Sequence, residues 1–106
     1  MTDLRYIAEN LSDEDILCQI SEEADELAKA ALKLRRAITG TNPTPVTVGE
    51  AVENLIEEYG DTVVAFRAYA KKSEIDTEVY ELSNEDIESK FYRWAKRIKE
   101  GKKHDN

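Results

Sequence analysis

The chain has 106 residues and a mass of 12.1 kDa, a length typical of one domain. It carries 15 Lys and Arg against 23 Asp and Glu, so its net charge is −8 at pH 7. This acidity argues against nucleic acid and anionic membranes as partners, because both repel an acidic surface. One cysteine excludes an internal disulfide, and one histidine, His104, disfavours histidine-based metal chemistry. No apolar run approaches the roughly 18 residues of a membrane span, and the opening residues lack a signal-peptide pattern. We therefore expect a cytoplasmic protein.

Apolar residues at helical spacing predict a first long helix over about 12–39. Ser12 is the expected N-cap, and Gly40 is the expected stop after two arginines. Cys18 is expected to be a small buried side chain. The apolar stripe that we expect to face the core consists of Leu17, Ile20, Ala24, Leu27, Ala31, Leu34 and Ile38.

A second long helix is expected over about 47–72, after a proline-containing loop at 39–46 that cannot continue the first helix. Thr47 and Glu50 form the capping box at its start. Gly60 lies inside this helix, where a glycine is unfavourable, so we expect close packing at that position. The expected core stripe is Val48, Val52, Leu55, Ile56, Tyr59, Val63, Phe66 and Ala70.

A C-terminal helix is expected over about 83–99, followed by a polar tail at 100–106. Residues 2–10 are compatible with a short helix, and 73–82 are ambiguous. Two long antiparallel helices and a shorter third make a thin core for a single domain over 1–106. The predicted fold is therefore an all-α helical bundle that is completed by self-association, as a dimer or a tetramer.

Carboxylates border both predicted seams. Glu23 and Glu26 are neighbours on the first helix, as are Glu58 and Asp61 on the second, because residues three apart share a helix face. If the helices pack antiparallel, these four carboxylates converge and repel each other unless a cation lies among them. Hard oxygen ligands suit Mg²⁺, or Mn²⁺ in its place. The alternative is a solvated acidic face, since such spacings are common in a chain with 23 acidic residues.

The two motifs Glu23-Ala24-Asp25-Glu26 and Glu58-Tyr59-Gly60-Asp61 resemble the ExxE…ExxD signature of MazG-like nucleoside triphosphate pyrophosphohydrolases. The resemblance extends over roughly residues 15–70. It implies a Mg²⁺-dependent hydrolase that cleaves the α–β bond of an NTP or dNTP, and it makes Glu23, Glu26, Glu58 and Asp61 the metal ligands. This sequence departs from the family in its longer interval of 31 residues between the motifs and in Tyr59, where leucine is more common.

Other residues are candidates for supporting roles. Glu22 or Glu23 would orient or deprotonate the attacking water, and the sequence does not choose between them. Lys33 or Arg36 could reach the outer phosphates, although pairing with nearby carboxylates explains them equally well. Asn42 could contact a base or sugar, although a turn-forming asparagine is the more common case.

A different class of function is also open. A non-catalytic acidic helical interaction or adaptor protein would keep the same bundle without turnover. The basic residues of the C-terminal helix, interpreted as a solvated face that could pair with an acidic partner subunit, are Arg93, Lys96, Arg97 and Lys99.

Overall fold

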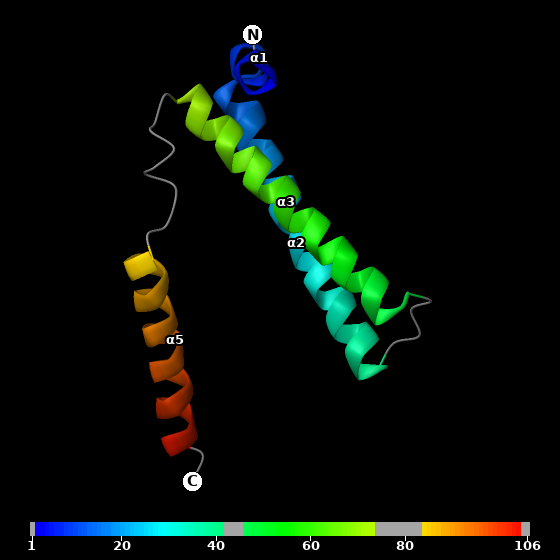
Figure 1. Cartoon of the computed structure of the whole chain (residues 1–106), viewed down its shortest axis with the longest axis vertical. Coiled ribbons are helices and arrows are strands. Elements are labelled where there is room, and N and C mark those ends of the chain that lie inside the picture. The colour runs from blue at the N-terminus through cyan, green and yellow to red at the C-terminus, as the bar shows by residue number, and fades with distance from the viewer. Residues whose placement is uncertain (1, 42–45, 74–83, 105–106) are drawn as a thin grey trace. The chain divides into compact units, whose positions relative to one another are not determined.

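The computed structural model describes residues 2–41, 46–73 and 84–104, and these residues form helices and no strand. The predicted all-α fold class is confirmed. The chain divides into two compact units, Met1–Ile75 and Asp76–Asn106. The helices shown in Figure 1 are α1 (Asp3–Asn10), α2 (Asp13–Thr39), α3 (Val48–Lys72) and α5 (Asn84–His104).

The predicted helix boundaries rest on local capping chemistry, which the structure confirms. The Ser12 hydroxyl accepts from the backbone N–H of Asp15 at 3.1 Å, and the Thr47 hydroxyl accepts from that of Glu50 at 3.1 Å. Gly40 ends α2 in the left-handed conformation, with φ of 66°. One boundary differs from the prediction, because α5 continues to His104 through most of the expected polar tail.

The first unit is built on α2 and α3, which lie side by side with the chain turning back between them (Figure 1). Ile16 is 1% exposed and Ala51 is fully buried, and one row of buried or half-buried residues recurs at steps of three and four along each helix. Ala68 and Ala70, near the end of α3, are buried outside this row. We call these two rows the inner seam. Its residues are Ile16, Ile20, Glu23, Leu27, Ala30, Leu34 and Ala37 on α2, with Ala51, Leu55, Glu58, Thr62, Ala65, Tyr69 and Lys72 on α3. The short α1 also packs against α3.

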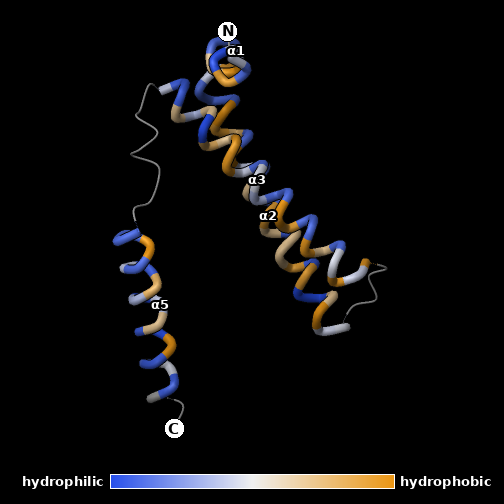
Figure 2. Tube along the Cα trace, in the orientation of Figure 1, coloured by the Kyte–Doolittle hydropathy of each residue, from blue (hydrophilic) through white to orange (hydrophobic). Residues whose placement is uncertain are grey.

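Much of the apolar stripe predicted to face the core lies on the surface instead. On α2, Leu17 and Ile38 are exposed, as is Cys18, which we expected to be buried. On α3, Ile56 is 65% exposed and Tyr59 is 62% exposed. Apolar positions recur along both helices in Figure 2, and each helix carries more of them than the inner seam takes up. The pair formed by α2 and α3, which we call the hairpin, therefore has a second apolar face. We call it the outer stripe, and its residues are Leu17, Ala24, Ala31 and Ile38 on α2 with Val52, Ile56, Tyr59 and Phe66 on α3.

Gly60 does not mark a close approach within this unit. A Cβ atom built at Gly60 would meet nothing within 4 Å, so the expectation of tight packing there is wrong for the hairpin by itself. No helix in the described part of the chain is long and apolar enough to cross a membrane.

Candidate functional site

Carboxylates occupy the middle of the inner seam. Glu23 on α2 and Glu58 on α3 are half-buried, at positions where the helical repeat would otherwise place apolar side chains. Asp61, one turn beyond Glu58, is exposed at the edge of the seam. Each of the three offers one ligand atom, and these atoms all lie within 4.8 Å of one another. Three of the four predicted metal ligands are thus brought together by the packing of α2 on α3.

One hydrogen bond joins the two helices at this point, and two others each lie within a single helix. The Thr62 hydroxyl donates to the backbone carbonyl of Glu58 on its own helix at 2.9 Å, and it lies 3.3 Å from the carbonyl of Glu23 on α2. The side-chain amide of Gln19 donates to the Glu23 carboxylate at 2.8 Å. Sequence reasoning assigned no role to Gln19 or Thr62. Each lies four residues from a candidate ligand on the same helix, which is a signal that could have found them.

The pKa of the Glu58 carboxyl is raised above its ordinary value. Partial burial is the largest cause, because desolvation disfavours the charged form. Repulsion by the carboxylates of Asp61, Glu23, Glu26 and Glu57 follows in that order. The electrostatics therefore agree with the geometry, because the carboxylates that raise the pKa of Glu58 come from both helices.

The other predicted carboxylates lie beside this group of three. Glu26 is exposed, and its carboxylate pairs with Lys29 on the same helix at 3.4 Å. Glu26 is close enough to raise the pKa of Glu58 but is not among the three whose ligand atoms converge. Glu22 is exposed on α2 next to Glu23. Its carboxylate is therefore open to solvent.

The predicted phosphate-binding residues lie further along α2. Lys33 and Arg36 are half-buried, ten and thirteen residues beyond Glu23. At about 1.5 Å per residue, these intervals correspond to roughly 15 and 20 Å along the helix axis. One copy of the hairpin therefore does not place Arg36 beside the three carboxylates. Asn42, the third predicted contact, lies outside the described residues.

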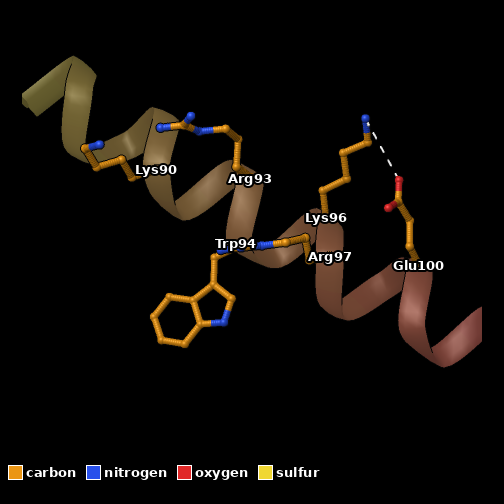
Figure 3. A pocket seen from close by; sticks show the side chains of 6 residues that line it. All are labelled: Lys90, Arg93, Trp94, Lys96, Arg97 and Glu100. Atoms are coloured by element: carbon orange, nitrogen blue, oxygen red, sulfur yellow. Dashed lines mark ion pairs between the residues drawn. The ribbon is translucent and has the colours of Figure 1, made fainter.

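The second unit presents a basic and aromatic surface on α5 (Figure 3). Lys90, Arg93 and Arg97 line this surface together with Trp94, which is 56% exposed and whose indole points away from Lys90 and Arg93 in Figure 3. Lys96 pairs with Glu100 one turn away at 3.9 Å. This arrangement agrees with the interpretation of α5 as a solvated basic face, since it is the surface of one exposed helix.

Comparison with known proteins adds no constraint on this site. No family model, curated protein or solved structure matches the chain.

Proposed function

We propose that this protein is a Mg²⁺-dependent nucleotide pyrophosphohydrolase that cleaves the α–β bond of an NTP or dNTP. The observation that carries the proposal is the convergence of Glu23, Glu58 and Asp61 from two helices, with ligand atoms within 4.8 Å of one another. These residues belong to the two motifs that resemble the MazG-like signature. Acidic clusters also occur on surfaces without any ligand, so the proposal depends on the motifs and the geometry together.

The donor set fits a hard divalent cation. All three side chains are carboxylates, which Mg²⁺ and Mn²⁺ prefer over softer ligands. Their ligand atoms lie within 4.8 Å of one another, which is close enough for the three residues to share one cation. The raised pKa of Glu58 also fits, because a carboxylate crowded by like charges is stabilised in its ionised form by a cation.

The residues of the chain would divide the chemistry between them. Glu23, Glu58 and Asp61 would hold the metal, and Glu26 would add negative charge beside it. When bound, Mg²⁺ neutralises phosphate charge and lowers the pKa of a coordinated water. Glu22 or Glu23 would accept the proton of the attacking water, and Glu22 has the solvent access that this role needs. Thr62 and Gln19 would keep the Glu23 segment in position.

We further propose that α2 and α3 are the two long antiparallel helices of a bundle that a second copy completes. The outer stripe supports this, because Ile56 and Tyr59 are more than half exposed and lie on one face with Phe66. A homo-oligomer would bury this face. Light scattering at micromolar concentration should give a mass of at least two chains, and Ile56→Glu should reduce it to one chain with helicity unchanged. A monomeric wild type would contradict this part of the proposal.

The alternative function is a non-catalytic acidic helical interaction protein, and the outer stripe favours it equally well. Pyrophosphate release from a panel of NTPs and dNTPs, with Mg²⁺ and with EDTA, distinguishes the two. The pyrophosphohydrolase proposal expects metal-dependent release from at least one nucleotide. Folded protein that releases pyrophosphate from none of them would favour the interaction protein.

A pair of neighbouring variants assigns any activity to the site. Glu58→Gln removes a ligand charge from the half-buried seam position with little change in size, and we expect it to reduce turnover by a factor of about 100 or more. Glu57→Gln makes the same chemical change at an exposed neighbour and should retain most of the activity. Equal activity of the two variants would remove Glu58 from the site.

A further inference from the structure

A cavity at the far end of α2 is separate from the carboxylate cluster. It has a volume of about 270 Å³, and its lining residues are Leu32, Arg35, Arg36, Thr39 and Thr41. Arg36 lies about 20 Å from Glu23 along the helix. This cavity is slightly smaller than the range of about 300 to 1,000 Å³ that is usual for drug-sized ligands. Its size therefore suits a small group better than a whole nucleotide.

The charge around this cavity is opposite to that of the protein as a whole. The sequence from Leu27 to Gly49 has four basic residues, including Arg35 and Arg36, and no Asp or Glu, in a chain of net charge −8. Among the described residues, neither arginine forms an ion pair with a carboxylate, whereas Lys29 earlier on the same helix pairs with Glu26. The two guanidinium groups therefore have no carboxylate paired with them among the described residues, although the chain as a whole is acidic.

Arg36 has unused hydrogen-bonding capacity. Its Nε atom is buried and has no hydrogen-bond partner among the described residues. A buried donor without a partner is costly, and a shift of the Arg36 side chain toward an anion in the cavity would give this donor a partner. The ordinary role of an arginine at a helix C-terminus is to satisfy the last carbonyls. Here the carbonyl of Arg36 already accepts from the Gly40 N–H at 2.8 Å, and the Thr39 hydroxyl donates to the carbonyl of Arg35 at 3.0 Å.

We propose that this cavity binds a phosphate-type oxyanion. Guanidinium groups match the oxygens of a phosphate with two parallel hydrogen bonds, and the side chains of both Arg35 and Arg36 line this cavity. The hydroxyls of Thr39 and Thr41, which lie 2.8 Å apart, add two further polar groups to the wall. The ligand is a free inorganic phosphate or pyrophosphate, or the phosphate tail of a nucleotide, and these share the same recognition chemistry.

The test is calorimetric titration of the full chain with pyrophosphate, a nucleoside triphosphate and the corresponding nucleoside, all in EDTA at low ionic strength. EDTA prevents a metal from bridging phosphate to the carboxylates, so the result is independent of the proposed hydrolase activity. Both phosphate compounds should bind and the nucleoside should not. Tighter binding of the triphosphate than of pyrophosphate would identify the nucleotide tail as the source, and the reverse would identify the free anion. Binding of none of the three, or equal binding of the nucleoside, would overturn the proposal.

Matched variants localise the binding. Arg36→Gln and the exposed Arg35→Gln should each weaken pyrophosphate binding about tenfold or more, since each removes a charged hydrogen-bonding partner. Arg36→Lys keeps the charge but loses the paired donors, and its affinity should lie between those of Arg36→Gln and wild type. Lys29→Gln makes the same change in charge on the same helix and should bind as wild type, as should Glu58→Gln. If Lys29→Gln loses as much pyrophosphate affinity as both arginine variants do, the loss is explained by net charge alone, and the proposed site is wrong.

Discussion

Replacing Glu23 by leucine tests whether a charged residue in the middle of the inner seam lowers the free energy of unfolding. Position 23 is half-buried between α2 and α3 and lies within the acidic cluster. Burying a whole leucine side chain contributes roughly 1.5 to 3 kcal/mol, so about half of that, near 1 kcal/mol, is available at a half-buried position. Removing one of several like charges acts in the same direction. For a unit of this size, 1 kcal/mol raises the melting temperature by about 4 to 8 °C.

The assay is thermal unfolding at pH 7 in EDTA and then in Mg²⁺. Without metal, Glu23→Leu should melt above wild type, whereas Glu22→Leu, at an exposed neighbour, should change stability by about 0.5 kcal/mol or less. With Mg²⁺, wild type should gain stability through binding to the folded state, and Glu23→Leu should lose most of that gain. A metal-free Glu23→Leu protein that melts at or below both wild type and Glu22→Leu would refute the reasoning about the seam.

Two further predictions follow from single residues. The pKa of Glu58 is raised in the folded state above its ordinary value of 4.5, so the folded metal-free protein binds that proton more tightly than the unfolded chain does. The free energy of unfolding should therefore decline as pH rises from about 4.5 through the folded pKa. Denaturant unfolding in EDTA between about pH 4 and 7 should show a smaller decline for Glu58→Gln, and parallel curves for the two proteins would contradict this. Gly60→Ala should raise the free energy of unfolding by about 1 kcal/mol, because the site is helical with open space at Cβ, whereas Gly40→Ala at φ of 66° should lower it. Loss of stability in Gly60→Ala would indicate a close approach there in the assembled protein.

Helix limits were predictable because they depend on a few neighbouring residues. The N-caps at Ser12 and Thr47 and the left-handed stop at Gly40 each use a bond or a backbone angle within four residues of the boundary. The end of α5 was less predictable. Lys102 and Lys103 read as a polar tail, but lysine is a good helix former and is also favourable near a helix C-terminus.

The face that each helix buries was only partly predictable from hydrophobic periodicity. Both α2 and α3 carry two apolar rows about one residue apart, and on α3 the larger side chains, such as Ile56 and Phe66, lie in the outer one. Alanines line much of the inner seam, including Ala30 and Ala51, where small side chains let the helices approach closely. On α3, a count of large apolar residues therefore favours the wrong row. On α2 the inner seam does hold large residues such as Leu27 and Leu34, and treating Glu23 as a residue beside the seam gives a stripe that mixes the two rows.

The convergence of the carboxylates was partly predictable. Spacing of three along each helix grouped Glu23 with Glu26 and Glu58 with Asp61, and the order of the helices suggested that the pairs meet. Which member of each pair points inward depends on the rotation of the helix. Because Glu23 lies in the inner seam, Glu26 turns toward solvent and pairs with Lys29, which is a tertiary result that local spacing does not contain.

The seam carboxylates and the outer stripe are physically linked. Glu23 and Glu58 take positions in the inner seam at which apolar side chains would stabilise the packing of α2 on α3. That packing is therefore less stable in a single chain. Tyr59, in the outer stripe, is the residue directly after Glu58, whereas Asp61 lies on the other side of Glu58 on the helix. A second copy packed on this stripe would exclude water from the flank of the carboxylates, and a lower local dielectric strengthens their attraction for a cation. The same burial without a cation strengthens their mutual repulsion. Assembly and metal binding, as we propose them, should therefore favour each other, since linkage makes the coupling reciprocal.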